Sequence, residues 1–169
     1  MKRTIGGKLG NMTAKSGKEA RQNPDLGKTI VAGVKDRPSK RVSAAVVEYA
    51  DKLTLQNFVT ERTADDATVY TDQSRAYKDL PREHDTVTHS VGEYVKGDAS
   101  TNGMESFWSL FKRGYHGTFH HLSEKHLPRY VREFTGQHNI RDLDTIDQMA
   151  ALVQGIVGKR LRYRDLVAG

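Results

Sequence analysis

Two acidic residues and one lysine in the middle of the chain have the spacing of a site for phosphoryl transfer. Asp72 ends the short run "ATVYTD", and Glu105 lies 33 positions later in "STNGMESFWSLFKRGYHGTFHH", seven residues before Lys112. Converging carboxylates are ligands that Mg²⁺ prefers, and two bound metal ions can promote attack on a phosphate. A lysine on the same side would hold the phosphate backbone of a nucleic acid. The three residues therefore predict two-metal phosphoryl transfer.

Each of these residues also has an ordinary structural interpretation. An aspartate at a strand end often caps the next helical turn, which here is "SRAY". Glu105 and Lys112 lie two turns apart on one helix, which suits a solvated face equally well. The occurrence of one acid at a strand end and a second on a helix favours the chemical interpretation. Side chains at the carboxyl ends of strands in open sheets point into a ligand crevice.

The stretch from residue 100 to residue 121 must position Glu105 and Lys112, and its apolar pattern predicts a helix. Four large apolar residues recur at i, i+3, i+4 and i+7, which makes one stripe that should pack on a sheet. A second stripe, on a heptad rhythm, is polar. Gly114 and Gly117 are expected to break the helix. The apolar stripe is Met104, Phe107, Trp108 and Phe111, and the polar stripe is Asn102, Glu105, Ser109, Lys112 and His116.

The rest of the chain alternates strands and helices. Two β-rich runs on either side of "RPSK" predict a hairpin, and Asp51 is placed to cap the helix that follows it. A hairpin followed by alternating helices and strands implies a mixed sheet flanked by helices. The expected elements are strands over 28–36, 41–50, 67–72 and 84–91, a helix over 51–62, helical turns over 74–80, and helices after the long one within 123–139 and 144–161.

This order is that of the ribonuclease H-like α/β fold, with one difference. That fold opens with three antiparallel strands, whereas only two are complete in the sequence, so most of the first strand is expected to be missing. The predicted domains are a basic flexible arm over 1–28, an incomplete ribonuclease H-like catalytic domain over 29–141, and a helical C-terminal extension over 142–169.

Charge and composition narrow the class of protein. Most of the formal net charge of +6 lies in residues 1–28, which hold seven Lys or Arg and two acids. Such a segment suits a polyanion, or it is a solvated terminus. The chain of 169 residues has no cysteine, which excludes disulfides and cysteine-bearing zinc ribbons. It has no apolar run of about 18 residues and no secretory signal, so we expect a cytoplasmic protein without a membrane span.

Five segments carry a resemblance to a known family. "VYTDQSRAY", "VTHSVGEYV", "TNGMESFWSLFKRGYHGTFHH", "KHLPRYVREF" and "VGKRLRYRDL" resemble, in order, the transposase domain of DDE-type insertion-sequence transposases of the ISXO2-like group. The resemblance implies a ribonuclease H-like fold and DNA cleavage and strand transfer with Mg²⁺ or Mn²⁺ at a two-metal site. It also implies that the partners are DNA, as transposon ends and target, and further copies of the chain in a homo-oligomer.

The resemblance also assigns roles to residues. By motif position, Asp72 is the second catalytic acid, Glu105 the third, and Lys112 the basic residue that follows. Asn102 belongs to the same motif and is a further candidate for the site. Contacts with DNA are expected from Lys112, Arg113 and Lys8.

The beginning of the sequence departs from the family pattern. That pattern opens with Asp-Glu-Thr-Tyr-Ile-Gly-Gly-Lys, whereas here "MKRT" stands before "IGGK". In this register the first catalytic acid falls on Met1. Carboxylates that position two metals act as a unit, so we expect this polypeptide alone to be inactive or severely impaired.

Two other functions are compatible with the sequence. One is a non-catalytic remnant that binds DNA or pairs with a complete transposase and interferes with it, and the other is a different ribonuclease H-like nuclease. His116 and His120 have the spacing of a zinc pair on a helix, but packing or contact with DNA is the simpler role. The roles of His89 and His121 stay open. The acids Asp142, Asp144 and Asp147 are expected to serve the start of a helix.

Overall fold

Three antiparallel strands form the centre of the protein in the computed structural model, which describes residues 2–6, 28–72, 74–86, 102–119 and 122–167. The strand order is β1-β2-β3, with Lys2 opposite Ala32 and Val31 opposite Val46. The predicted hairpin is confirmed. The strands are β1 (Lys2–Gly6), β2 (Lys28–Lys35) and β3 (Val42–Val47).

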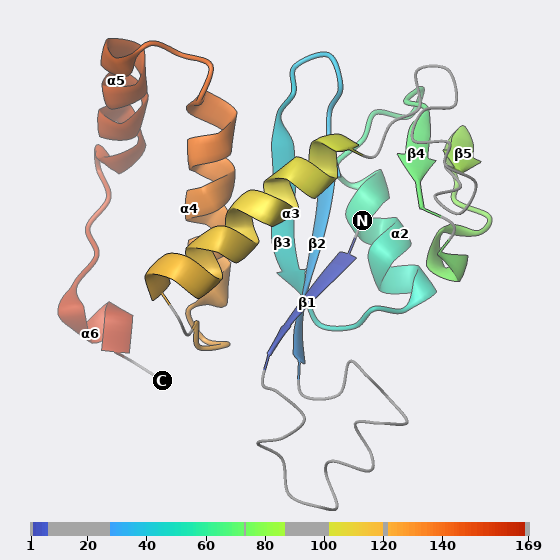
Figure 1. Cartoon of the computed structure of the whole chain (residues 1–169), viewed down its shortest axis with the longest axis horizontal. Coiled ribbons are helices and arrows are strands. Elements are labelled where there is room, and N and C mark those ends of the chain that lie inside the picture. The colour runs from blue at the N-terminus through green and yellow to red at the C-terminus, as the bar shows by residue number, and fades with distance from the viewer. Residues whose placement is uncertain (1, 7–27, 73, 87–101, 120–121, 168–169) are drawn as a thin grey trace, which may run out of the picture.

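Helices cover both faces of this sheet, as Figure 1 shows. Successive side chains of a strand point to opposite faces of the sheet, and β2 has apolar side chains on both faces. Val31 packs into the core formed with α3 (Asn102–Gly114) and α4 (Leu127–Ile140). Its neighbour Ala32 packs into the second core, formed with α2 (Lys52–Thr60). The sheet is thus the middle layer of three.

The helix α2 forms as the sequence predicts. Asp51 caps it, because its carboxylate accepts a hydrogen bond from the Thr54 N–H at 2.8 Å. Leu55 and Phe58 are buried, whereas Leu53 is 70% exposed.

The strand that precedes Asp72 belongs to a second, smaller sheet. The strand β4 (Val69–Thr71) pairs in parallel with β5 (His84–Thr86), and a 3₁₀ turn, η2 (Arg75–Tyr77), lies between them. The architecture is therefore mixed α/β, as predicted. It differs from the prediction in having two small sheets in the described part of the chain instead of one mixed sheet, since these two strands pair only with each other.

The N-terminal segment also differs from the prediction. The first strand, expected to be mostly missing, is present as the five residues of β1, and the predicted flexible arm therefore does not include residues 2–6. The backbone of β2 pairs with this strand along its whole length. The basic composition of the segment gave no indication of a strand. Residues 7–27 of the predicted arm lie outside the described residues.

The C-terminal part of the chain is helical. The α3 helix ends at Gly114, as expected, but the backbone continues as a short π-helix, η4 (Tyr115–Phe119), so Gly117 does not break it. After α4 follow α5 (Thr145–Ile156) and α6 (Tyr163–Val167), which Figure 1 shows at the outer side of α4. No described helix is long and apolar enough to cross a membrane.

Candidate active site

Asp72 follows directly on β4, where hydrogen bonds fix the backbone around it. The Thr71 hydroxyl donates to the Asp72 carbonyl at 2.8 Å and accepts from His84 Nε2 on β5, also at 2.8 Å. The hydroxyl has one proton, so the imidazole must be the donor. The Asp72 carboxylate is half-buried, and its Oδ1 accepts a hydrogen bond from the Ser74 N–H at 3.3 Å. The N-cap of the following 3₁₀ turn is Ser74, whose side chain accepts from the Ala76 N–H, so the expected capping role does not fall to Asp72. The contact with the Ser74 N–H occupies one carboxylate oxygen of Asp72.

A hollow of about 840 Å³ opens beside Asp72. Its wall includes the end of β2, the hairpin turn, Asp72, and Gly103 and Met104 from the first turn of α3. The strand end and the helix start are thus brought to one cavity, although of the two predicted acids only Asp72 lines it. Four basic side chains also line the hollow, namely Lys35, Arg37, Lys40 and Arg62.

Two side chains that line this hollow, Tyr77 and Lys35, have shifted pKa values. Burial, and then the negative charge of Asp72, raise the pKa of Tyr77 to about 12. At the end of β2, burial and the nearby cations Arg141 and Lys40 lower the pKa of Lys35. The Lys35 amine lies against α3, since a Cβ on Gly103 would stand 2.9 Å from its Nζ. An anion in the hollow would relieve the crowding of positive charge around this lysine.

The apolar stripe of α3 fixes the direction in which its polar residues point. Met104, Phe107, Trp108 and Phe111 are all buried, which confirms the predicted packing face. At Gly33 of β2 a Cβ would stand 2.7 Å from Met104 Cε and 2.9 Å from the Trp108 ring. Glycine at this position therefore allows the helix to lie directly on the strand.

The polar residues of α3 lie away from the sheet. Glu105 is half-buried, and Lys112 and Arg113 are exposed in the last turn. Glu105 has no partner among the described residues, and it is not part of the wall of the Asp72 hollow, although the two residues before it are. His116 is exposed, with its ring edge against Tyr115.

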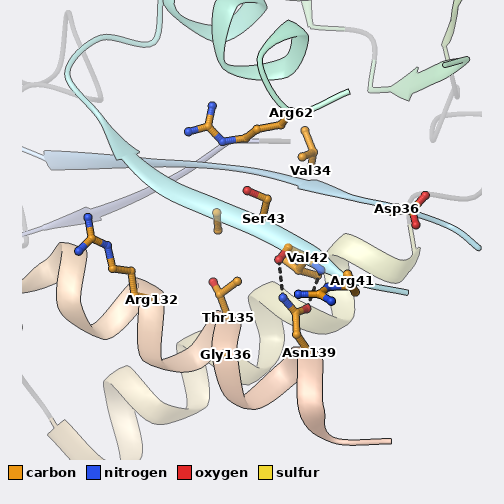
Figure 2. A pocket seen from close by; sticks show the side chains of 11 residues that line it. Val34, Asp36, Arg41, Val42, Ser43, Arg62, Arg132, Thr135, Gly136 and Asn139 are labelled. Carbon is orange, nitrogen blue, oxygen red and sulfur yellow. Dashed lines mark hydrogen bonds between the residues drawn. The ribbon is translucent and has the colours of Figure 1, made fainter. Parts of the chain in front are cut away.

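A second hollow, of about 490 Å³, adjoins the first. Figure 2 shows its wall, to which β3 and α4 contribute most of the residues. The two hollows share Val34, Asp36 and Arg62. Arg41, Arg62 and Arg132 give the second hollow a positive character, and Arg132 has no partner among the described residues. No sequence signal marks these arginines, because Arg41 lies before β3, Arg62 after α2 and Arg132 in α4, and only the fold brings them together.

Several predicted site residues lie outside the described part of the chain. These are Lys8, His89, His120 and His121, and for Asn102 the backbone is described but the side chain is not. Among the described residues, no group of three or more His, Asp or Glu side chains could hold a metal ion. Asp144 does serve a helix start, because its carboxylate accepts from the Asp147 N–H at 2.9 Å.

The class of protein follows from comparison with known families. A family model described as the ISXO2-like transposase domain matches residues 4–139. The chain belongs to this family, and the resemblance inferred from the sequence motifs is confirmed. The match ends before α5, so the tail motif "VGKRLRYRDL" lies beyond it.

One curated relative is of similar origin. The chain is 34% identical over 103 residues to a protein of Halobacterium salinarum named "Uncharacterized protein in transposable element ISH50". The aligned part is 59% of this chain and 35% of that protein, so the chain spans about a third of the relative's length. No solved structure matches the chain.

Proposed function

We propose that this chain is the catalytic domain of a DDE-type transposase, which cleaves DNA at the ends of an insertion sequence and joins them to a target. The proposal rests on membership of the transposase family and on the hollow that Asp72 shares with the first turn of α3. The element order and the helices on both faces of the central sheet support a ribonuclease H-like domain. We place its action on DNA in the cytoplasm.

Asp72 and Glu105 are the proposed metal ligands. Each is half-buried, and the one hydrogen bond that the Asp72 carboxylate makes within the described residues, from the Ser74 N–H, uses Oδ1 alone. Such hard oxygens suit Mg²⁺ or Mn²⁺, although two carboxylates are fewer than a two-metal site needs. When bound, the metal ions supply charge that activates a water or a 3′ hydroxyl and stabilises the attacked phosphate. Asn102 is proposed as a further residue of this site by its place in the motif.

The basic residues around the two hollows are proposed to hold the DNA backbone. Lys35, Lys40 and Arg62 face the scissile phosphate region, and Arg132 extends the positive surface along β3. Lys112, Arg113 and Lys8 are proposed to contact the flanking DNA. Phosphate contacts of this kind give affinity that falls steeply with salt.

Fluorescence anisotropy with labelled duplex DNA over a salt series tests this surface. Removing one phosphate contact reduces the salt slope by about 1. We therefore expect a weaker affinity and a shallower slope for Arg132→Ala than for the wild type. The matched control is Lys78→Ala, which removes an exposed cation that lines neither hollow. Equal effects of the two substitutions would contradict the proposed surface.

We further propose that strand transfer by this domain needs a third carboxylate on the strand that leads into "IGGK", at the register position where Met1 stands. The strand that would carry this acid reaches the hollow, since Lys2 pairs with Ala32 and the next residue, Gly33, lines the hollow. An aspartate at position 1, placed behind an added initiating methionine, should raise Mn²⁺-dependent cleavage of DNA carrying the element ends. The control has asparagine at that position.

Cleavage that depends on Glu105 in the unaltered polypeptide would show that a carboxylate at this position is not needed. DNA binding without cleavage in every variant would favour the second candidate function. In that function the chain is a non-catalytic module that binds DNA or interferes with a complete transposase, and the arginines of the second hollow favour it equally.

A further inference from the structure

The α5 helix carries a large apolar surface that the rest of the chain leaves uncovered. None of its residues is buried, although its sequence is amphipathic. Seven apolar residues on and around it are between 43% and 78% exposed. They are Leu143, Ile146, Met149, Leu152, Val153, Ile156 and Val157.

The helix is capped at its start, and the segment that follows its end is bound to the rest of the chain. At its start, Asp144 caps it and Gln148 donates to the Leu143 carbonyl at 2.7 Å. After its end, α6 is bound back to the start of α4, because Lys125 donates to the Val167 carbonyl and Arg129 to the Asp165 carbonyl, both at 3.1 Å. Figure 1 shows α5 at the outer side of the molecule, beyond α4.

The spacing of the apolar residues fits a second helix. Ile146, Met149, Val153 and Ile156 follow one another at intervals of three and four residues, the seam of a helix pair. Together these seven residues expose a patch on the order of several hundred Å², the scale of the surface that one partner contributes to an interface. Monomeric proteins rarely expose apolar patches larger than a few hundred Å².

The charges at the two ends of α5 identify the partner as another copy of the same helix. Asp142, Asp144 and Asp147 stand at its start, and Lys159 and Arg160 follow its end. If two copies pair in antiparallel fashion about the middle of the seam, Ile146 lies opposite Ile156 and Met149 opposite Val153. The acids at the start of α5 in one copy then lie near Lys159 and Arg160, which follow the end of α5 in the other. A parallel pair would place acids against acids and cations against cations.

We propose that α5 is a self-association surface through which two copies of this chain form an antiparallel, two-fold symmetric dimer. Such an interface is isologous, so each contact occurs twice. The dimer forms without DNA or metal, and the proposal therefore does not depend on the proposed function.

Sedimentation equilibrium of the full chain in the absence of DNA is the first test. We expect a reversible monomer–dimer equilibrium. Val153→Glu should weaken association at least tenfold, because it would bury an unpaired charge at the centre of the seam. Gln154→Glu is the matched control, since it adds the same charge to the exposed other side of the helix and should leave association unchanged. Unaltered far-UV circular dichroism would show that both variants fold.

Disulfide cross-linking tests the antiparallel register. The chain has no cysteine, so an introduced one is unique. In a mixture of Met149→Cys and Val153→Cys proteins, the mixed disulfide should form faster than either symmetric one. Arg160→Asp should weaken the dimer, and the double variant Asp142→Arg/Arg160→Asp should restore it.

Other results would overturn the proposal. A monomer at every concentration, or a dimer that Val153→Glu leaves intact, would exclude α5 as the self-association surface. Preferred Met149–Met149 cross-linking would exclude the antiparallel arrangement. Binding of the monomer to phosphatidylglycerol vesicles, lost in Val153→Glu, would assign the apolar face to lipid instead.

Discussion

The helices α3 and α5 are similar in length and in amphipathic pattern, but they bury their apolar faces to opposite degrees. The apolar stripe of α3 is buried against the sheet and α4, with Trp108 only 1% exposed, whereas no residue of α5 is buried. The helix α3 packs closely on the sheet at Gly33, where the missing side chain leaves room for it, whereas α5 has no such surface against it in the described part of the chain. An apolar stripe thus shows that a helix has a face suited to burial. Whether that face is buried within the same chain depends on whether another part of the chain packs against it.

The largest predicted difference between the two helices is in core stability. Trp108→Ala removes a fully buried ring and should lower the free energy of unfolding by about 3–5 kcal/mol. Ile146→Ala removes an exposed side chain of α5 and should change the same free energy by less than about 0.5 kcal/mol. Urea denaturation at concentrations where the protein is monomeric measures both. Equal losses would mean that α5 is packed within the monomer.

Close packing at the end of α3 gives the next largest effect. Gly114→Ala would bring a Cβ within 2.1 Å of the Phe134 Cζ on α4, so one helix must shift, at a cost of about 1–3 kcal/mol. Gly136→Ala in α4 is the matched control, because nothing lies within 4 Å of the added atom. The control should stabilise the protein by up to about 1 kcal/mol. Thermal unfolding of the two variants would then shift in opposite directions.

The caps of α2 and α5 allow a smaller test of the same comparison. Asp51→Ala and Asp144→Ala each remove a side chain that accepts a hydrogen bond from the first turn of its helix. The first should lower global stability by about 1 kcal/mol, because α2 is packed on the sheet. The second should mainly speed amide hydrogen exchange over residues 145–148 and leave the urea midpoint nearly unchanged. A loss of global stability from Asp144→Ala would contradict the isolation of α5.

The smallest effect concerns pH. His138 of α4 lies against Phe107, with ring centroids 5.5 Å apart, and burial, assisted by Arg141 and Lys35, lowers its pKa below the usual 6.5. The unfolded chain therefore takes up the proton first as the pH falls. The stability that the neutral ring contributes is present above pH 6.5 and is lost as the pH falls through the lowered pKa. His138→Phe should flatten the urea midpoint against pH in this range, and α5 variants should not.

Much of the fold could be predicted from local patterns. The hairpin, the Asp51 cap, the packing face of α3 and its end at Gly114 each follow from residues close together in the sequence. The pairing of β1 was not predicted, because basic residues such as Lys2 and Arg3 conceal a strand whose partners lie in β2. Likewise, β4 and β5 pair only with each other among the described strands, which no local signal indicates.

The candidate site was predicted in part. Asp72 does stand at a strand end and shares a hollow with the first turn of α3. The roles of Asp72, Glu105 and Lys112 in chemistry stay predictions. Arg62 and Arg132 could not be identified from sequence, because surface arginines are common and only the packing of α4 on β3 makes these two neighbours of one hollow. His84, which supports Thr71, has no sequence signal either.

The side chain of Asn139 has a consequence for the behaviour of the protein at high concentration. Its amide donates to the Val42 carbonyl at 2.9 Å and accepts from the Val42 N–H at 2.7 Å, on the outer side of the edge strand β3. One residue of α4 thus occupies both outward backbone groups of Val42, so another chain cannot add a strand at this end of the edge. A helix that slipped away from β3 would leave these groups unpaired and open to strand addition by a second molecule.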